Sequence, residues 1–567
     1  MLQIFFISIV FIFLIFGLGL FFKWLIPGTF KSTFDWFDPF WIGFAILIAF
    51  LQLWHFALPV NTYALFVVTI VAVLGWFSNR KQVLKNLSLR SALGLIGLIL
   101  VLLVLINQVL FSEASYDHGL YHLQTVKWFN QFPIVPGLGN LQHRLAFNST
   151  NYLYAALLNT SIFHGYSYFV STVILVGLLI LQSLVSLLGW ITAPQSASKT
   201  RLMYMILLPV ILWHVSTQPL AGYPADMTIF VFQIVIFGKL LSLKEEEPNL
   251  PLFWQILILT AAASTVKLSF IPFGALVVLT AVYQVYHYVK SSQQLKQFVL
   301  VSLGTIFLWG LPWLVRNIFL SGYLLYPSHY IKLPFRWTMP AFLVNDLQAG
   351  ISLWARTNSG HLVYTADLSW FLQWLKRFVF EPRGIIFLSL LLLLSLVGLS
   401  IRKKSKRIPL NSYIFLLPLT GISILIWFLS APTYRFSGAV IWLFFIVVFL
   451  MLYDWVLLNI STKTAANLTL VLVLFLFFFL QNGFSKNFSF SNLFVVENEI
   501  AIAQNQQPVE TSIVKTTASG LEINVPAEGE LCWDLPLPCT TPNDFLSTLT
   551  LIDPMDMGKG FYIEHSE

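Results

Sequence analysis

The sequence predicts an all-α polytopic transmembrane bundle of about 14 helices, followed by a small C-terminal tail. Three observations support this: charged residues are scarce, apolar runs of spanning length recur, and basic residues gather in the short loops between those runs. Of the 567 residues, 57% are hydrophobic and only 10% are charged, whereas soluble domains carry about 25% charged residues. So few charges cannot cover a surface in water. We therefore expect the lipid bilayer to surround much of the chain.

Apolar runs long enough to cross the hydrocarbon core of a bilayer occur from the first residue onward. The first run, Met1–Phe22, has no basic start and no small-residue cleavage site, so it is typical of a retained membrane helix rather than a cleaved signal peptide. The expected spans lie near 3–22, 40–57, 60–77, 91–111, 168–190, 202–217, 226–241, 252–266, 270–289, 297–319, 384–401, 410–429, 438–458 and 466–481.

Lysine and arginine in short loops mark the cytoplasmic side of membrane helices. Even numbers of expected helices separate the basic loops, so these loops share one face. The loops 112–167 and 320–383 of the transmembrane domain (1–481), and the tail 482–567, are then extracytoplasmic. The same pattern explains the net charge of +8 without any nucleic-acid partner. The loop residues are Arg80, Lys81, Lys85, Arg90, Lys199, Arg201, Lys290, Lys296, Arg402, Lys403, Lys404, Lys406 and Arg407.

The tail after Gln481 is polar and differs in character from the rest of the chain. The β-branched stretches 512–517 and 521–525 predict short strands. Cys532 and Cys539, the only two cysteines, enclose a proline-rich turn. In an oxidising compartment this arrangement favours a local disulfide, and in a reducing cytoplasm it would leave two free thiols. The predicted sidedness favours the disulfide.

The first external loop carries a run of polar residues from Asp117 to Gln124. Its helical spacing puts Asp117, Tyr121 and Gln124 on one face and apolar residues on another, which predicts an amphipathic helix at the membrane surface. Asp117 at its start has two possible roles: an N-cap of the helix, or a general base at the boundary between water and membrane.

Two histidines lie four residues apart in the same stretch, His118 and His122. This spacing puts both rings on one helical face and is compatible with a metal site shared with Asp117, to which His143 or Glu113 could add a ligand. A site without metal is favoured over this alternative, and no other cofactor is predicted.

Several charged residues lie at the outer ends of the expected helices: Asp226, Lys267, Arg316 and Arg435. A charge near the hydrocarbon either snorkels to water or faces the bundle interior, where it is paired or functional. Four such residues at one level, near the Asp117 loop, favour a shared pocket. The three cations among them suit a phosphate group.

The motifs resemble those of two groups of membrane proteins. The acidic external loop and the stretch Pro312-Trp-Leu-Val-Arg316-Asn317, followed by Gly322 and Tyr326-Pro327, resemble the GT-C class of membrane glycosyltransferases. The whole chain is also similar to an uncharacterised bacterial polytopic family, through its motifs at 116–122, 136–144, 431–436 and 532–540.

The resemblance implies a GT-C-like fold and an inverting transfer of sugar from a polyprenyl-phosphate-linked donor to a glycan or lipid acceptor. It places the protein in the bacterial inner membrane, with the reaction on the outer face, and maps the catalytic acid of the class onto Asp117. Many relatives show a closely spaced acidic pair, whereas here Glu113 and Asp117 lie four apart and three further membrane helices precede them. The expected substrate-binding residues are His118, Tyr121, His122, Arg144, Asn148, Asp226, Lys267, Arg316, Tyr326 and Arg435.

Two other functions compete with this one. A transporter or flippase of lipid-linked glycans keeps its polar residues near the bilayer midplane, often in repeated halves. Here the polar residues lie at the outer helix ends and no internal repeat is visible, which favours the enzyme. A polymerase or ligase of surface polysaccharide would use a similar external pocket.

Overall fold

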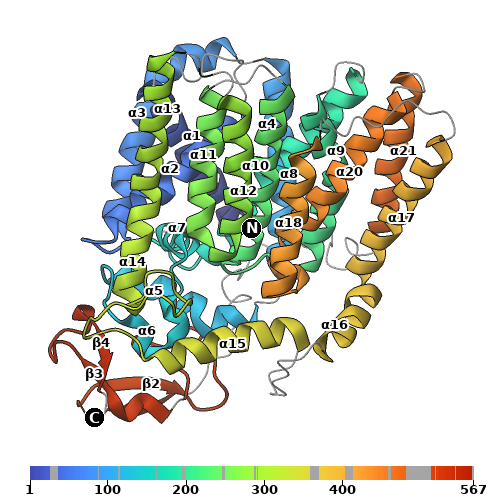
Figure 1. Cartoon of the computed structure of the whole chain (residues 1–567). Coiled ribbons are helices and arrows are strands. Elements are labelled where there is room, and N and C mark those ends of the chain that lie inside the picture. The colour runs from blue at the N-terminus through green and yellow to red at the C-terminus, as the bar shows by residue number, and fades with distance from the viewer. Residues whose placement is uncertain are drawn as a thin grey trace.

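The protein is mostly helical, with a small β region at its C-terminus (Figure 1). The computed structural model describes residues 1–25, 36–86, 88–110, 112, 115–160, 163–193, 198–245, 250–286, 289, 291–357, 369–402, 413–457, 462–480, 512–517, 519–542 and 544–564. Glu113, Lys290 and residues 403–407, with four of the predicted basic residues, lie outside these ranges, as do Gln481 and residues 482–511 of the tail.

The helices and strands have the following bounds. The helices of the first half are α1 (Leu2–Leu25), α2 (Asp38–Trp54), α3 (Thr62–Lys85), α4 (Leu89–Leu110), α5 (Leu123–Gln131), α6 (Leu138–Leu141), α7 (Thr150–Leu158), α8 (Ser167–Thr192), α9 (Lys199–Thr217), α10 (Ala225–Glu245), α11 (Leu250–Val266) and α12 (Ile271–Tyr286). Those of the second half are α13 (Ser292–Thr305), α14 (Leu311–Ser321), α15 (Ala341–Thr357), α16 (Ser369–Phe380), α17 (Pro382–Arg402), α18 (Leu416–Ser430), α19 (Tyr434–Ser437), α20 (Val440–Leu457) and α21 (Thr462–Leu480). The strands are β1 (Ser512–Thr516), β2 (Glu522–Pro526), β3 (Leu549–Leu551) and β4 (Phe561–Ile563).

Within the described residues, nine helical segments are long and apolar enough to cross a membrane. They comprise α1, α3, α4, α8, α9, α10, α12 with the turn before it, α13 joined to α14, and α20. Four further apolar helices are shorter than such a span: Asp38–Trp54, Leu250–Val266, Leu416–Ser430 and Thr469–Phe478. The protein is therefore embedded in a membrane, and the count of about fourteen spans stays a prediction.

Small residues let the first helices approach closely. α1 packs against both α2 and α3. A Cβ atom on Gly43 of α2 would lie 1.8 Å from the carbonyl oxygen of Ile15 in α1, closer than any two such atoms can stand. Close backbone approach through glycine is the usual way in which helices pack inside lipid, where no hydrophobic force drives them together.

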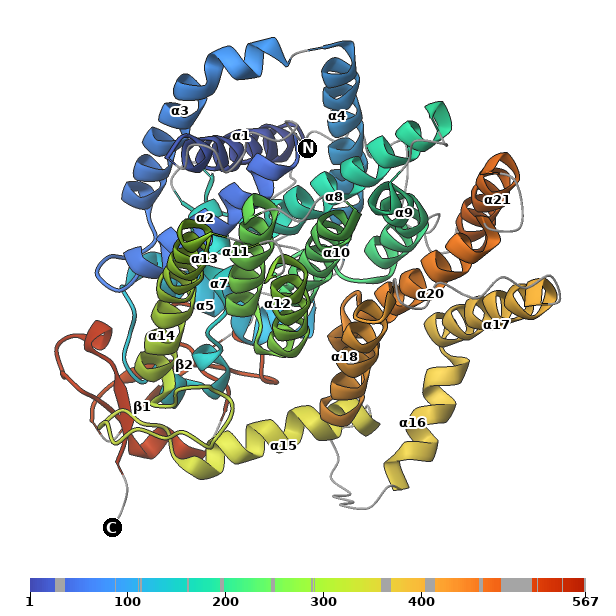
Figure 2. The same cartoon turned by 45° about the horizontal axis from the view of Figure 1, so that its top comes forward.

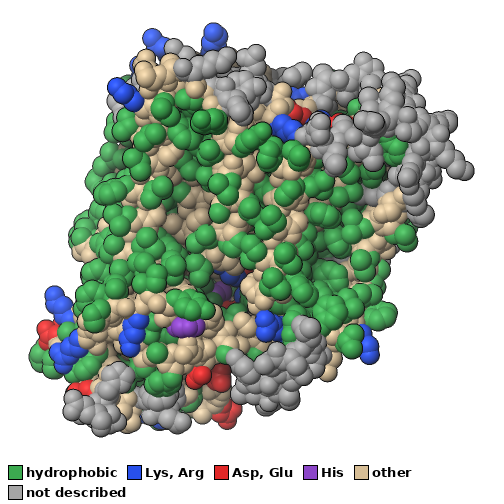
Figure 3. Space-filling model, in the orientation of Figure 1, with side chains coloured by type: hydrophobic (Ala, Val, Ile, Leu, Met, Phe, Trp, Pro, Cys, Tyr) green, Lys and Arg blue, Asp and Glu red, His purple; other side chains and the backbone are tan. Residues whose placement is uncertain are grey.

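The two ends of the bundle differ. The end of α3, the start of α4 and the start of α13 lie at the top of Figure 1. They carry basic residues of the predicted loops: Arg80, Lys81, Lys85, Arg90 and Lys296. The strands and α15 lie at the bottom, where α15 runs across the helix ends (Figures 1 and 2). Hydrophobic side chains cover the middle of the face in Figure 3, and charged side chains of both signs appear toward its lower edge.

The C-terminal lobe, residues 512–564, contains two small antiparallel sheets. β1 pairs with β2, and β3 pairs with β4. The predicted strands at 512–517 and 521–525 match β1 and β2 to within a residue at each end. The lobe packs on the segment 116–141 rather than standing apart, because Phe561 donates its backbone N–H to Pro136 O and Thr540 donates its hydroxyl to Leu141 O.

Candidate active site

Asp117 lies at the start of a π-helical turn, His118–His122, that leads directly into α5. The backbone of Asp117 is already helical, with φ −59° and ψ −26°, and its side chain makes no capping hydrogen bond. The N-cap interpretation is therefore wrong, and the carboxylate is free to face another part of the molecule. π-turns inside helices occur frequently at functional sites.

The Asp117 carboxylate belongs to a chain of alternating charges. Arg435 of α19 donates from Nη2 to Asp117 Oδ2 at 2.5 Å and from Nε to Asp226 Oδ2 at 2.6 Å. Lys267, between α11 and α12, forms an ion pair with the other oxygen of Asp226, which begins α10. We call Asp117, Arg435, Asp226 and Lys267 the ion cluster. Its formal charges sum to zero.

The ion cluster is open to solvent on one side. The side chains of Arg435 and Asp117 keep 33% and 25% of their surface exposed, and those of Lys267 and Asp226 keep 26% and 14%. A polar molecule can therefore reach these charges. Figure 3 shows charged side chains recessed among hydrophobic ones in the lower half of the molecule.

Arg435 controls the ionisation of Asp117. Burial alone would raise the pKa of the Asp117 carboxyl, but the Arg435 guanidinium, its hydrogen bond and the nearby His122 together hold that pKa below its usual range. Asp117 is consequently a carboxylate at neutral pH, and so it can accept a proton.

The two histidines of the π-turn are buried and neutral. Burial holds the pKa of His118 well below its usual range and lowers that of His122 to about 4. The His118 ring packs against Tyr168, Tyr223 and Trp533. Among the described residues, neither of its ring nitrogens has a hydrogen-bond partner.

The predicted metal alternative lacks a ligand set in the described part of the chain. No group of three or more His, Cys, Asp or Glu side chains there is arranged to hold a metal ion. The rings of His118 and His122 lie 6.3 Å apart, centroid to centroid, and nearly perpendicular at 80°. Glu113, one of the two candidate further ligands, lies outside the described residues.

Arg316 does not join the ion cluster. The residue is fully buried, donates from Nε to Asn148 Oδ1 at 3.1 Å, and contacts His55 Nδ1 at 2.8 Å. Its guanidinium also lies over the Phe129 ring, 5.4 Å from the centroid. The predicted substrate-binding set is therefore corrected for two residues. Arg316 has no surface that a sugar-phosphate substrate can reach, and Asn148 is its hydrogen-bond partner.

Arg144 lies near the tyrosines of the Asp117 segment, and no acidic residue in the described part of the chain pairs with it. It is half-buried, and it lies close enough to Tyr116 and Tyr121, on either side of Asp117, to act on the pKa of both hydroxyls. Among the residues that the structure describes, none forms an ion pair or a hydrogen bond with its guanidinium. Tyr326, also close to Arg144, donates its hydroxyl to His143 O at 2.7 Å.

The charged residues of the site lie within a part of the chain that matches a known protein family. A family model described as "Domain of unknown function (DUF8201)" matches residues 1–442. The chain belongs to this family. No curated protein and no solved structure matches the chain. The DUF8201 match contains the whole ion cluster, Arg144 and Arg316, whereas the C-terminal lobe follows it.

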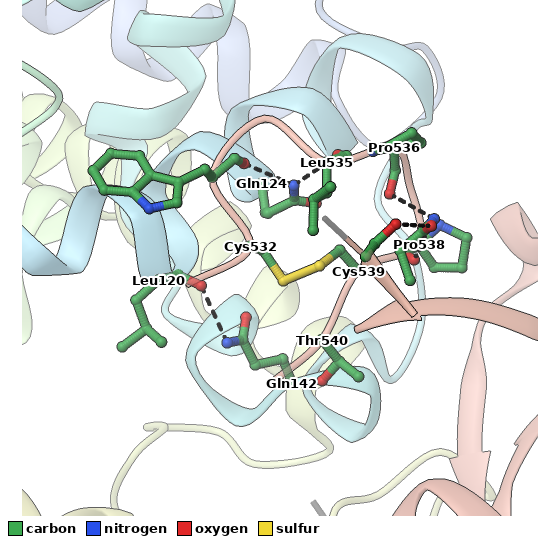
Figure 4. Close-up of a disulfide and its surroundings, with 12 residues drawn as sticks. Leu120, Gln124, Gln142, Cys532, Leu535, Pro536, Pro538, Cys539 and Thr540 are labelled. Atoms are coloured by element: carbon green, nitrogen blue, oxygen red, sulfur yellow. Dashed lines mark hydrogen bonds between the residues drawn. A yellow bond between two sulfur atoms is a disulfide. The ribbon is translucent and has the colours of Figure 1, made fainter. Parts of the chain in front are cut away.

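The lobe beyond the DUF8201 match contacts the Asp117 segment directly. Cys532 and Cys539 form the disulfide that the sequence predicts, with an S–S distance of 2.11 Å. The loop that it closes accepts hydrogen bonds from Gln124 of α5 (Figure 4). The predicted surface helix is therefore corrected: nearly every residue from His118 to Phe129 is buried, because the lobe covers the face that would otherwise meet water.

Sequence reasoning missed some residues that shape this site. Trp533 lies against the π-turn, and Tyr152 hydrogen-bonds Tyr121. The only local signal for Trp533 was its place between the two cysteines, and Tyr152 stands in an ordinary apolar helical stretch.

Proposed function

We propose that this chain is an integral membrane glycosyltransferase of the GT-C type. It transfers a sugar from a polyprenyl-phosphate-linked donor to a cell-envelope acceptor on the outer face of the bacterial inner membrane. The observation that carries this proposal is the ion pair of Asp117 with Arg435, because it keeps a partly exposed carboxylate ionised beside several cations.

The proposed reaction is a single displacement at the anomeric carbon of the donor sugar. Asp117 accepts the proton of an acceptor hydroxyl, whose oxygen forms a bond to the anomeric carbon. The bond from that carbon to the phosphate oxygen breaks, and the phosphate leaves with the electron pair. Because attack and departure occur on opposite faces of the sugar, the configuration inverts.

The leaving phosphate carries the charge that needs stabilisation. Arg144 is the best candidate to hold it, because its guanidinium has no ion-pair partner among the described residues and lies near Tyr116 and Tyr121. Guanidinium binds phosphate oxygens in a bidentate fork. Lys267 and Arg435 add positive charge, although each is already paired with a carboxylate.

A direct experiment tests the proposal. The purified full-length protein, reconstituted in liposomes, is incubated with a panel of radiolabelled polyprenyl-phosphate sugars and a cell-envelope extract as acceptor. Transfer of label by the wild type and its loss in Asp117→Asn support the proposal. Movement of the intact donor across the liposome membrane without transfer would instead favour a flippase. Growth of long glycan chains would favour a polymerase.

A further inference from the structure

The disulfide-closed loop, Cys532–Cys539, lies directly on the π-turn that begins after Asp117. Trp533 donates its backbone N–H to the carbonyl oxygen of Gly119 at 2.8 Å. A Cβ atom on Gly119 would lie 2.6 Å from the Trp533 ring, so only glycine lets the ring rest on the backbone here. Trp533 itself is only 7% exposed.

Two side chains of α5 hold the same loop. Gln124, fully buried, donates from Nε2 to Trp533 O at 2.9 Å and to Leu535 O at 3.0 Å (Figure 4). Lys127 donates from Nζ to Leu535 O at 2.8 Å and forms an ion pair with Asp534 at 3.0 Å. Lys127 Nζ also donates to Asp534 O at 3.1 Å. Three carbonyl oxygens of the loop are therefore hydrogen-bonded by side chains of one helix.

The contacts of the lobe lie on both sides of Asp117 in the sequence. Tyr116, the preceding residue, donates its hydroxyl to Glu530 at 3.0 Å. Gly119, Gln124 and Lys127, which also contact the lobe, follow Asp117 in the sequence. A π-turn is rare because it is less favourable than the regular α-helix, so it depends on tertiary contacts to persist.

We propose that the disulfide-closed loop of the C-terminal lobe is a positioning element, which fixes the π-turn so that the Asp117 carboxylate faces Arg435. The positioning residues are Trp533 of the loop and Gln124 of α5, which binds the loop. The proposal adds to the proposed function a part of the site that lies outside the family match, and only the catalytic consequence rests on that function.

Hydrogen exchange of the purified full-length protein tests the positioning without any substrate. Gln124→Met keeps the length of the side chain but removes both hydrogen bonds, and Trp533→Ala removes the ring. Each should speed amide exchange in the segment 115–131 at least tenfold while peptides of α10 stay protected. Trp533→Phe, which keeps an aromatic ring, should restore most of the protection. Lys515→Ala, on the exposed edge of β1, is the matched control in the same lobe.

Unchanged exchange of 115–131 in Gln124→Met overturns the proposal. Should Trp533→Ala also lose protection in α10, that variant has unfolded, and Gln124→Met alone decides. The double variant Cys532→Ser/Cys539→Ser repeats the test on the disulfide, and it should speed amide exchange in the segment 115–131. An exchange rate in this variant equal to that of the wild type would count against the positioning role of the loop.

The pH profile of sugar transfer supplies the second test, with the radiolabelled polyprenyl-phosphate sugars as probe. The charged and titratable groups that act on Asp117 are Arg435, His122 and Asp226. When Asp117 drifts from Arg435 its pKa rises, so the acidic limb of the profile should move to higher pH in Gln124→Met. A loss of folded protein alone lowers the rate without moving that limb, and such a result contradicts positioning. Absence of transfer by the wild type would count against the proposed function only, because exchange still decides the positioning.

Discussion

Arg435 Nη2 lies 2.5 Å from Asp117 Oδ2, although the two residues are 318 positions apart in the chain. The same guanidinium reaches Asp226, so one cation joins two carboxylates from different parts of the protein. The described residues therefore contain a spatial acidic pair, Asp117 with Asp226.

The first prediction concerns the proton acceptor. Asp117→Asn should lower the transfer rate by roughly 10²–10⁴-fold, because an amide cannot take a proton from a hydroxyl at neutral pH. The protein should still fold, because Arg435 keeps its second carboxylate partner, Asp226, when Asp117 loses its charge. Transfer is measured with the radiolabelled donors, and the amount of protein in the membrane is the control. Full activity in this variant would remove Asp117 from the reaction.

The second prediction is an energetic coupling between Asp117 and Arg435. Arg435→Gln leaves two carboxylates near each other with Lys267 as the remaining cation, and should destabilise the protein by roughly 1–3 kcal/mol. This is less than the roughly 3–5 kcal/mol of a fully buried pair, because both side chains are partly exposed. Asp117→Asn added to Arg435→Gln should recover part of the loss. Thermal unfolding of the single and double variants in detergent measures the coupling, and strict additivity would contradict the ion pair.

The third prediction concerns stability at acidic pH. Burial lowers the folded-state pKa of His122 from 6.5 to about 4, so the unfolded chain binds the proton more tightly. Stability should therefore fall as the pH decreases from about 6.5 to about 4, by roughly 3 kcal/mol at most for this residue. The lowered pKa of Asp117 changes the stability only at pH values below the usual pKa range of an Asp carboxyl, outside this window.

Unfolding temperatures at pH 7.5 and pH 4.5 check this prediction. His122→Asn should reduce the difference between the two but not abolish it, because burial also lowers the pKa of His143 to about 4. An equal difference in wild type and variant would show that His122 does not contribute.

Local signals in the sequence were enough for several parts of the structure. Hydropathy located the apolar helices, β-branched runs located β1 and β2, and two isolated cysteines indicated their disulfide. Asp226, Lys267 and Arg435 stand out in the sequence because a charge at the end of a membrane helix needs a partner. Asp117 stands out because it begins a helix at the boundary between water and membrane. These features depend on neighbouring residues, which a sequence displays directly.

Tertiary contacts decided the rest. Arg316 and Arg435 both lie at the outer ends of expected membrane helices, but their partners differ. His55 and Asn148 enclose Arg316, while Asp117 and Asp226 meet Arg435. The amphipathic pattern after Asp117 predicted a surface helix, because nothing local reveals that Trp533, 409 residues beyond Gln124, covers it. Which partner encloses a side chain is set by packing over long separations.

The fourth prediction is the orientation of the chain in the membrane. The native cysteines are joined in a disulfide, so a single cysteine introduced elsewhere gives an unambiguous signal. An impermeant maleimide should label Lys515→Cys in intact cells and Lys404→Cys only after the membrane is opened. Labelling of 404 but not 515 in intact cells would place the ion cluster on the cytoplasmic side.

The last prediction separates two arginines that sequence reasoning treated alike. Arg144→Gln should raise the KM for the polyprenyl-phosphate donor, because the phosphate loses a charge-assisted contact of roughly 1.5–3 kcal/mol, or about 10–150-fold in affinity. Its unfolding temperature should change little, because no described residue pairs with the Arg144 guanidinium.

Arg316→Gln should behave in the opposite way. The change leaves His55 and Asn148 with unsatisfied buried groups, at a cost of roughly 1–3 kcal/mol for each. The protein should therefore unfold at lower temperature, while the folded fraction keeps the wild-type KM, because Arg316 exposes no surface to a substrate. The two variants make the same substitution and remove the same charge, so each is the control for the other. A raised KM in Arg316→Gln with normal stability would return Arg316 to the phosphate site and remove Arg144 from it.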